Sequence, residues 1–194
     1  MLTNRRSLRN ILIAVLATLP VALISSLALR SNADDGELAL VANITDRTLT
    51  VKRNGEVVKV YDVAVGSGKH PTPPGAYSIR KIVWNPAWIP PDRAWARDKV
   101  PQGPGDPDNP MKVVKIFFRE PDFFIHGTGA TESLGTAASH GCLRMDPDQA
   151  AELALLLMED NGVARDWDWV KGILHMGESR TVSLDRAVPM DVIE

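Results

Sequence analysis

The feature that most constrains the fold of this chain is Asn54-Gly55, which stands between two stretches rich in alternating apolar and polar residues. Asn-Gly in this setting is the strongest short-range signal for a two-residue β-hairpin. Residues 48–53 predict the first strand of the hairpin, and residues 56–65 predict a long second strand that ends at a glycine turn. Residues 38–44 predict a strand before them. Because each strand needs one buried face, the pattern favours a two-layer or barrel-like β core.

The second half of the chain predicts further strands and one well-marked helix. Asp146-Pro147 is a helix start, with an acidic N-cap and proline at the first helical position. The apolar helix over residues 150–158 is expected to stop near Asn161-Gly162. The fold class is therefore mainly β, with one or two short helices. The other expected strands cover residues 76–83, 113–118, 122–125, 181–184 and 188–193.

A proline-rich middle, residues 71–110, lies between these two halves. Proline fixes φ and removes a backbone donor, so this stretch predicts stiff loops around the strand at 76–83. Its tryptophans, Trp84, Trp88 and Trp95, predict that the loop is ordered. Two interpretations stay open, since the rings could line the wall of a groove or could pin the loop onto the β core.

The remaining tryptophans and two of the histidines are assigned no chemistry. Trp167 and Trp169 lie near Val170, so we expect both rings to pack on the core. His175 has no acidic or cysteine neighbour in the chain and is interpreted as structural. His70 stands in a polar, proline-flanked loop and is expected to be exposed.

The amino terminus carries a targeting pattern. Three arginines precede an uncharged run over residues 11–29, which is long enough to span a bilayer core. The same pattern fits a cleavable signal peptide, so residues 1–30 are predicted to be a membrane anchor or a signal peptide. The charge bias places the rest of the chain outside the cytoplasm, in the periplasm and at the inner membrane. Residues 31–37 then form a short linker, and residues 38–194 form the working domain.

Cys142 is the sole cysteine, so the chain forms no intramolecular disulfide. It directly follows His140-Gly141, and a second histidine, His126, is close enough in the chain to fold back onto it. An imidazole that takes the thiol proton is the basis of Cys/His covalent catalysis. The alternative is a small buried hydrophobic residue without chemistry. One cysteine and two nearby histidines match the ligand sets of zinc sites poorly, so no metal is expected. The net charge of −2 gives no sign of nucleic-acid binding.

Two motifs and three proline segments carry a family resemblance. The motifs are His126-Gly127-Thr128 and, after a variable loop, Ser139-His140-Gly141-Cys142-Leu143-Arg144-Met145. The segments are Pro71-Thr72-Pro73-Pro74-Gly75, Asn85-Pro86-Ala87-Trp88-Ile89-Pro90-Pro91, and the stretch from Gly103-Pro104 to Asn109-Pro110. Together they resemble the L,D-transpeptidase family with its YkuD-type catalytic domain, over about residues 38–193. The resemblance implies a YkuD-like β-sandwich or barrel-like domain. The chain departs from the family at Met111-Lys112, where Leu-Gly is usual.

The resemblance implies a role for each residue of the two motifs. Cys142 is the nucleophile, and His126 is the general base and later the acid. The carbonyl of Gly127 holds the imidazole in its tautomer, and the amides of Gly141 and Cys142 form the oxyanion hole. The guanidinium of Arg144 suits a donor carboxylate, although a structural bond to loop carbonyls stays open. The residues implied in substrate binding or its support are Arg144, His140, Ser139 and Thr128, with Ser139 also expected to brace the turn.

The substrate that the resemblance implies is the tetrapeptide stem of peptidoglycan. Cys142 attacks the carbonyl of the third residue, releases D-alanine and passes the acyl group to an amine, with no metal or organic cofactor. The acceptor is another stem, giving a 3-3 crosslink, or a lysine of an outer-membrane lipoprotein. Carbapenems are expected to acylate Cys142. Residues 127–138 are expected to form a mobile flap over the site.

Two other functions stay open at this point. A hydrolase with the same residues would let water resolve the thioester, which would make the chain an L,D-carboxypeptidase or an amidase. A catalytically silent wall-binding module is the other alternative. Its mark would be loss of Cys142 or His126, and both are present.

Overall fold

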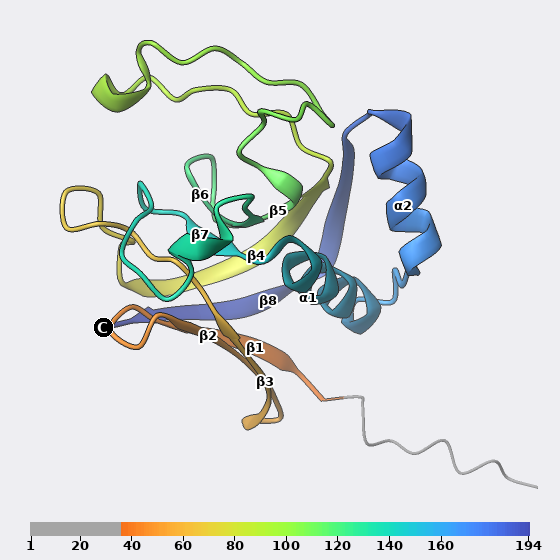
Figure 1. Ribbon diagram of the computed structural model, residues 1–194. Coiled ribbons are helices and arrows are strands. Elements are labelled where there is room, and N and C mark those ends of the chain that lie inside the picture. Colours follow the sequence, from red (N-terminus) through yellow and green to blue (C-terminus); the bar gives the residue numbers. More distant parts are fainter. Residues whose placement is uncertain (1–35) are drawn as a thin grey trace, which may run out of the picture. The chain divides into compact units, whose positions relative to one another are not determined.

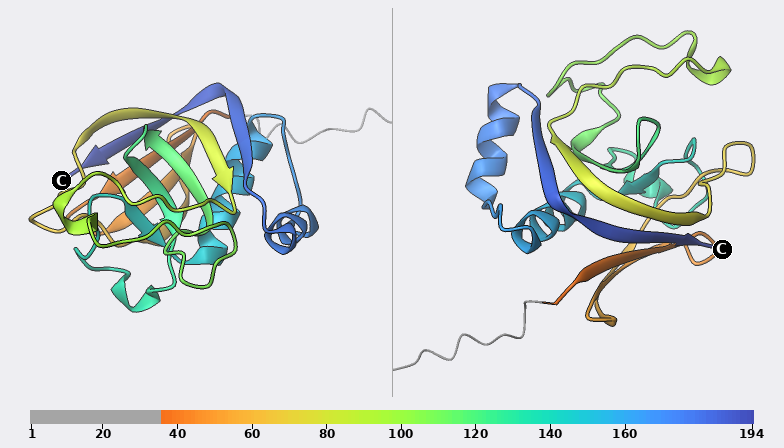
Figure 2. Two further views of the ribbon diagram at one scale, coloured as in Figure 1. Left: turned by 90° about the horizontal axis from the view of Figure 1, so that it is seen from above. Right: turned by 180° about the vertical axis from the view of Figure 1, so that it is seen from behind.

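The computed structural model describes residues 36–194, which form one curved eight-stranded sheet with two helices packed against it (Figure 1). The strand order is β3-β2-β1-β8-β4-β5-β6-β7, and the sheet curls until it is nearly closed into a barrel (Figure 2). The mainly β prediction is confirmed. The strands are β1 Leu38–Asn43, β2 Thr48–Arg53, β3 Glu56–Asp62, β4 Gly75–Trp84, β5 Lys112–Arg119, β6 Phe123–Gly127, β7 Leu143–Met145 and β8 Arg180–Ile193, and the helices are α1 Pro147–Asp160 and α2 Trp167–Met176, with short 3₁₀ turns at Ala94–Ala96 and Thr131–Ser133.

The β2–β3 hairpin forms as predicted. Asn54 and Gly55 both have positive φ, 54° and 84°, as a type I′ turn requires. Such a turn matches the right-handed twist of the strands on either side. The predicted alternation of β2 is also confirmed, because Leu49 and Val51 are fully buried.

β3 is shorter than the sequence predicted. It ends at Asp62, whereas the apolar pattern continues to residue 65. Residues 63–65 leave the sheet edge and remain buried because they pack elsewhere. Ala64 exchanges two main-chain hydrogen bonds of 2.9 Å with Arg144 of β7. A segment close to the first hairpin therefore reaches the opposite end of the sheet.

The carboxyl-terminal region is one strand rather than the predicted two. β8 pairs in parallel with β1 and antiparallel with β4. Its register against β4 shifts between Ile79 and Lys81, and residues 184–187 fall in that shift. A bulge of this kind bends a strand and increases its twist. The interruption in the alternating pattern therefore marks a bend in β8, which follows the curvature of the sheet.

The first helix, α1, begins and ends where the sequence predicted. The carboxylate of Asp146 accepts hydrogen bonds from the N–H groups of Asp148 (2.9 Å) and Gln149 (3.2 Å). These bonds satisfy two donors that a helix otherwise leaves unpaired at its start. The helix ends before Asn161. Its buried face packs on β5 and β6, the strands that carry the residues described below.

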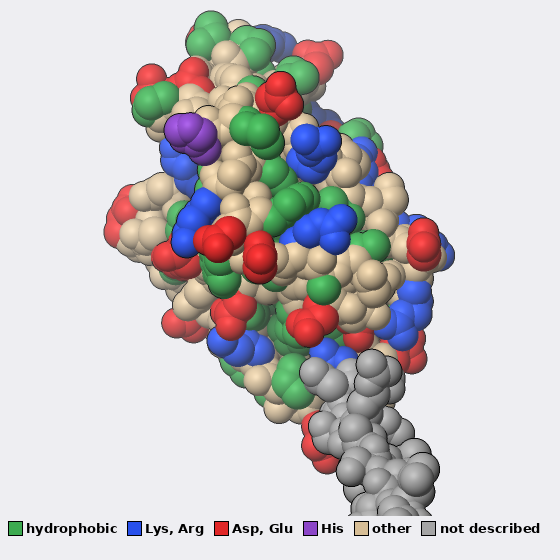
Figure 3. Space-filling view, turned by 90° about the vertical axis from the view of Figure 1, so that its right-hand side faces the viewer, with side chains coloured by type: hydrophobic (Ala, Val, Ile, Leu, Met, Phe, Trp, Pro, Cys, Tyr) green, Lys and Arg blue, Asp and Glu red, His purple; other side chains and the backbone are tan. Residues whose placement is uncertain are grey.

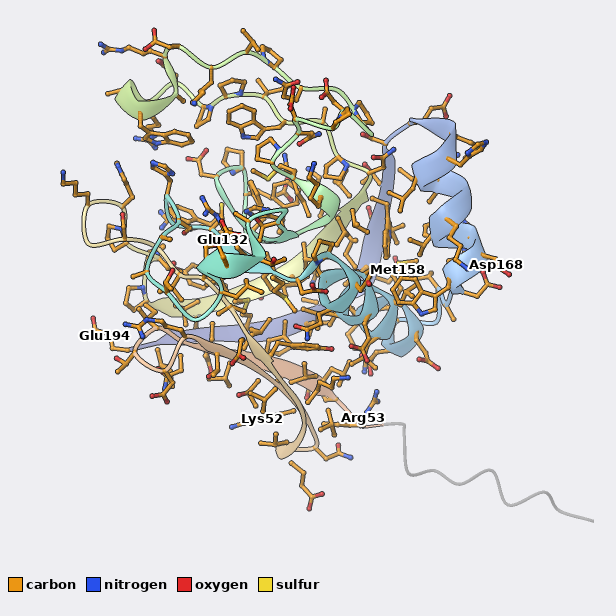
Figure 4. All side chains as sticks on the ribbon, viewed as in Figure 1. Lys52, Arg53, Glu132, Met158, Asp168 and Glu194 are labelled. Carbon is orange, nitrogen blue, oxygen red and sulfur yellow. The ribbon has the colours of Figure 1, made fainter. Side chains whose placement is uncertain are left out.

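The second helix, α2, confirms one tryptophan prediction and corrects the other. Trp169 packs edge-on against Trp84 of β4, with ring centroids 5.7 Å apart. The indole N–H of Trp84 in turn points to the sulfur of Met158 on α1, at 3.3 Å (Figure 4). Trp167 is 42% exposed, so its predicted core position is wrong. It stands in the first turn of α2, where only part of the helix faces the core.

The outer face over α2 mixes acidic and basic side chains without a patch of one sign (Figure 3). His175 is exposed on this helix, and its side chain makes no hydrogen bond or ion pair with other residues of the 36–194 region. The structural role predicted for His175 is therefore not supported by its position.

The predicted anchor or signal peptide, residues 1–30, lies outside the described residues, as does most of the linker over 31–37. Within residues 36–194, none of the helices has the length and apolar character needed to cross a membrane. The boundary between linker and working domain at residue 38 stays a prediction.

Candidate active site

The pairing of β6 with β7 brings the two motifs together on one face of the sheet. The strands are parallel, with His126 opposite Arg144 and Ile125 opposite Leu143. Side chains alternate along a strand, and paired residues point to the same face. Because Ile125 and Leu143 are fully buried in the core, His126 and Arg144 point to the other face. Cys142 stands two residues before Arg144, on that same face.

His126 is held by its neighbour in the chain. Its Nδ1 lies 2.8 Å from the carbonyl oxygen of Gly127. A carbonyl only accepts hydrogen bonds, so Nδ1 carries the proton and Nε2 is left as an acceptor. The pKa of His126 is lowered to about 4, chiefly by burial; the bond to Gly127 opposes this shift, and the nearby charges of Arg144 and Lys115 contribute to it. The imidazole is therefore neutral at physiological pH, which a general base requires.

Gly127 itself has no room for a side chain. A Cβ on Gly127 would lie 2.5 Å from the carbonyl oxygen of Lys112 and 3.0 Å from the Cα of Pro147. Both of these are main-chain atoms, which cannot turn aside. Glycine is therefore required where the carbonyl that orients His126 is positioned.

Cys142 carries a protonated thiol at rest. Its Sγ lies 3.3 Å from the carbonyl oxygen of Asp122, to which it donates. Loss of hydration raises the pKa of Cys142 to about 11, while a main-chain bond from Phe124 and the charges of Lys115 and Arg144 act in the opposite direction. The resting pair is thus a neutral thiol and a neutral imidazole, and the thiol needs a base before it can act as a nucleophile.

The turn before Cys142 is braced by two hydroxyls. Ser139 Oγ donates to the carbonyl of Cys142 (2.6 Å) and accepts from the N–H of Gly141 (3.0 Å). Thr72 Oγ1 donates to the carbonyl of Gly141 (2.9 Å) and accepts from the N–H of Gly66 (2.8 Å). Gly141 has φ 113°, which favours glycine. The expected bracing role of Ser139 is confirmed, and Thr72 is a second brace that its sequence context did not single out.

These bonds determine which of the two amides expected in the oxyanion hole is free to donate. The N–H of Gly141 is already used by Ser139, so it is not free for an oxyanion in this structure. The N–H of Cys142 has no hydrogen-bond partner among residues 36–194. An oxyanion hole here therefore rests first on the Cys142 amide, and the Gly141 amide joins it only if its bond to Ser139 opens.

Arg144 presents a guanidinium without a fixed partner. Its side chain makes no ion pair and no hydrogen bond within the described part of the chain. The alternative role of Arg144, a structural hydrogen bond to loop carbonyls, is therefore not observed. Burial lowers the pKa of Arg144, while Cys142 and Glu132 of the β6–β7 loop (Figure 4) raise it. A half-buried, unpaired guanidinium is suited to hold a carboxylate.

The other two predicted binding residues lie at the edges of the site. Thr128 is buried, and its Oγ1 accepts from the N–H of Ala130 at 3.2 Å. His140 is exposed, and its ring stacks on Trp95, with centroids 4.0 Å apart and planes tilted by 19°. His70 lies on the other side of His140 at 4.8 Å. His70 is half-buried beside the site, so its expected position in an exposed loop is wrong.

The proline-rich loop after β4 forms one wall of the site. Trp95 joins it to His140, and Arg93 forms an ion pair of 3.5 Å with Asp122, the residue whose carbonyl accepts from the thiol. Of the two interpretations of the tryptophan rings, Trp95 fits the one in which a ring lines the wall of the cleft. Trp84 fits the other, because it is fully buried in the β core. The sequence marked the loop as ordered but did not indicate which segment it would contact.

The predicted flap, residues 127–138, covers the end of β6 and most of the β6–β7 loop, and it is hydrogen-bonded to the segment after β3. Gly135 N–H donates to the carbonyl of Val63 (3.1 Å), and the carbonyl of Thr136 accepts from Val65 (3.0 Å). Ala130 reaches the cleft. These bonds fix the far half of the loop, and the mobility expected of it stays a prediction.

These elements enclose a cleft of about 1610 Å³. Small-molecule pockets commonly measure about 300–1,000 Å³, so this cleft has room for an extended peptide. Within residues 36–194, no three His, Cys, Asp or Glu side chains are grouped so that they could hold a metal ion. Among the residues that line the cleft are Lys115, Phe124, His126, Ser139, Cys142 and Arg144.

Comparison with known protein families assigns the chain. Residues 37–170 match the model of the YkuD domain, described as the L,D-transpeptidase catalytic domain. The chain belongs to this family. A Bacillus subtilis (strain 168) protein provisionally named L,D-transpeptidase YqjB is 32% identical over 123 residues. That match covers 61% of this chain and 65% of YqjB, so the chain spans just under two thirds of the length of this relative.

Solved structures of L,D-transpeptidases share the fold. The L,D-transpeptidase from Mycobacterium smegmatis is 24% identical with a TM-score of 0.50, covering 82% of this chain and 59% of its own. L,D-transpeptidase 3 from Mycobacterium tuberculosis, solved with a faropenem-derived adduct, is 18% identical with a TM-score of 0.52, covering 82% of this chain and 61% of its own. At these identities the likeness concerns the fold.

Proposed function

We propose that the chain is a peptidoglycan L,D-transpeptidase, an acyltransferase that works through Cys142. The observation that carries the proposal is that the Cys142 thiol and the neutral imidazole of His126, with its tautomer defined, line the same cleft of peptide size. Membership of the family supports the same activity. A wall-binding module without catalysis would have no need of this arrangement.

In the first half of the proposed reaction, His126 Nε2 takes the proton of the Cys142 thiol. The sulfur attacks the carbonyl carbon of the third stem residue and forms a tetrahedral oxyanion, to which the Cys142 N–H is free to donate. The C–N bond to the terminal D-alanine then breaks, and the imidazolium of His126 donates its proton to the leaving amine. The product is a thioester on Cys142.

In the second half, an acceptor amine attacks the thioester carbonyl and gives its proton to His126. The C–S bond breaks, and the sulfur leaves as a thiolate that is reprotonated. A second stem as acceptor yields a 3-3 crosslink, and a lysine of an outer-membrane lipoprotein yields an attached lipoprotein. Water in place of the amine would make the same site a hydrolase.

Donor recognition is assigned to Arg144. Its guanidinium is half-buried in the cleft and has no carboxylate partner within residues 36–194. A carboxylate of the stem peptide would supply that partner through two parallel hydrogen bonds. His140 and Trp95, stacked at the rim, bound the cleft on the side of the proline-rich loop.

The proposal also covers the location of the enzyme in the cell and the inhibitors that would act on it. Residues 11–29 would hold the enzyme at the inner membrane, or would direct its secretion if cleaved, with the cleft in the periplasm beside its wall substrate. Carbapenems would acylate Cys142 because the strained lactam carbonyl takes the place of the stem carbonyl.

The first experiment is intact-protein mass spectrometry of the full chain in mild detergent, with and without a carbapenem. One adduct per chain is expected, and none on the Cys142→Ala variant. The matched control is Ser133→Ala, a hydroxyl of the β6–β7 loop outside the motifs, which should acylate normally. A folded protein without any adduct would overturn the acylation mechanism.

A second experiment separates transferase from hydrolase. The enzyme receives a tetrapeptide stem with or without an amine acceptor such as a second stem. D-alanine is released in both cases, so crosslinked dimer formed in place of tripeptide when the acceptor is present supports transfer. Tripeptide as the sole product at saturating acceptor would assign the hydrolase.

A further inference from the structure

Lys115 of β5 stands next to the proposed catalytic pair, although no motif includes it. β5 pairs antiparallel with β6, and Lys115 lies opposite His126 while Phe117 lies opposite Phe124. Since His126 lies opposite Arg144 in turn, Lys115, His126 and Arg144 form a row across three neighbouring strands. Paired residues share a face, so the ammonium of Lys115 belongs to the cleft face that carries Cys142.

The position of the ammonium within the cleft is defined by two contacts. Lys115 Nζ donates to the carbonyl of Ala87 (2.9 Å) and lies 4.8 Å from the ring centroid of Phe124. The main-chain N–H of Phe124 also lowers the pKa of the Cys142 thiol. Lys115, Phe124 and Cys142 all line the same cleft.

Lys115 also differs from the paired lysines of this chain. Lys59, Lys81 and Lys171 form ion pairs with acidic side chains at the surface. Lys115 is half-buried and has no carboxylate partner among residues 36–194. An ammonium that is partly buried without a counter-charge loses hydration, and this loss lowers the free energy of unfolding. An apolar side chain at this position would avoid that cost and would give up only the bond to Ala87.

We propose, on the basis of the proposed acyl transfer, that Lys115 is a further functional residue whose ammonium stabilises the anionic sulfur of Cys142. The anion occurs twice in that reaction: when His126 takes the thiol proton, and when the C–S bond breaks as the acceptor amine resolves the thioester. Lys115 transfers no proton in either step. It lowers the energy of the charged sulfur by Coulomb attraction across the cleft.

The charges acting on the two groups agree with this arrangement. The charge of Lys115 lowers the pKa of Cys142 more than the charge of Arg144 does. In return, Cys142 raises the pKa of Lys115, which burial lowers to about 8. The ammonium is therefore mostly charged near neutral pH, when the stem peptide would be turned over, and loses its charge at mildly alkaline pH.

The test measures the thiol without any substrate. Cys142 is the sole cysteine, so the rate of alkylation of the full chain by iodoacetamide, followed by intact mass from pH 6 to 10, reports on this thiol alone. Lys115→Met should slow alkylation at pH 7, where the ammonium is mostly charged, by about tenfold, equivalent to about one unit of thiol pKa. Lys115→Arg keeps the charge and should retain most of the rate, also above pH 9. Lys112→Met is the matched control, since Lys112 lies on the same strand but donates to the carbonyl of Pro107 and should leave the rate unchanged.

A folded Lys115→Met variant with the wild-type alkylation profile would overturn the proposal. A raised KM for the stem peptide in that same variant would then assign Lys115 to substrate binding. Should the methionine variant fail to fold, a Lys115→Arg variant that alkylates tenfold more slowly than wild type would also contradict it. Because alkylation needs no acyl donor, these results are independent of whether the carbapenem adduct of the proposed function forms.

Discussion

The imidazole Nδ1 of His126 lies 2.8 Å from the carbonyl oxygen of Gly127, the next residue in the chain. In a Ser-His-Asp triad, a carboxylate orients the histidine. Here a neutral main-chain carbonyl performs that orientation, so no negative charge stabilises an imidazolium. This agrees with a resting site in which His126 is neutral and Cys142 is a thiol.

The first prediction concerns Gly127→Ala. The added Cβ would meet main-chain atoms at 2.5 and 3.0 Å, so the strand must shift and the carbonyl moves away from Nδ1. The carbapenem acylation rate, followed by intact mass, should fall at least about tenfold because misorientation of a catalytic group by about 1 Å is costly. Gly129→Ala is the control, since its Cβ would meet only the Lys112 side chain at 3.4 Å. Equal rates in both variants would contradict the orienting role.

The second prediction is a dependence of stability on pH. The pKa of His126 is lowered to about 4 in the folded chain, against 6.5 as its ordinary value. Between pH 6.5 and 4 the unfolded state binds more protons, so the free energy of unfolding falls as the pH falls, by about 2 kcal/mol between pH 7 and 4.5. Urea midpoints at the two pH values measure this. His126→Gln should show a smaller difference, and an identical difference would rule out His126 as its source.

The third prediction concerns Thr72, whose hydroxyl bonds both Gly66 and Gly141 and is 1% exposed. Thr72→Val keeps the shape but leaves a buried N–H and a carbonyl without this partner, which should lower the free energy of unfolding by about 1–3 kcal/mol. Chemical denaturation measures this loss. Thr72→Ser keeps the hydroxyl and should recover most of the stability. A valine variant as stable as wild type would show that the brace is not needed.

The fourth prediction concerns the stacking of Trp95 on His140. An aromatic pair contributes about 0.5–1.5 kcal/mol beyond its buried area, so Trp95→Ala should loosen the proline-rich loop. Trypsin should then cut at the basic residues of this loop about threefold to tenfold faster. Trp167→Ala, which alters an exposed ring on α2, should leave the cleavage rate at these sites unchanged. If both variants are cut alike, the stack does not hold the loop.

The fifth prediction concerns Arg144. Arg144→Met should raise the KM for a tetrapeptide stem at least about tenfold, because a charge-assisted bond to a carboxylate is lost. Arg144→Lys should restore part of the affinity, since an ammonium is a point charge without the planar fork. Steady-state kinetics measures both. A methionine variant that lost only kcat would assign Arg144 to the chemistry instead of donor binding.

Much of the fold follows from local patterns in the sequence. The Asn54-Gly55 turn, the alternation of β2 and the N-cap of α1 depend on residues only a few positions apart, so their chemistry is visible without knowledge of the rest. The same holds for the orientation of His126 by its neighbour Gly127. The two motifs were likewise enough to indicate the family.

The tertiary structure decided what depends on which strands are neighbours. An alternating pattern predicts that a strand has a buried face but not which strand lies beside it, because every strand offers the same main-chain donors and acceptors. The pairing of β5 with β6 therefore decided that Lys115 lies on the same face as His126, in the cleft that Cys142 lines, and the bond from Thr72 to Gly141 joins residues 69 positions apart. The sequence by itself determined the reactive residues, and long-range strand register determined which charges surround them.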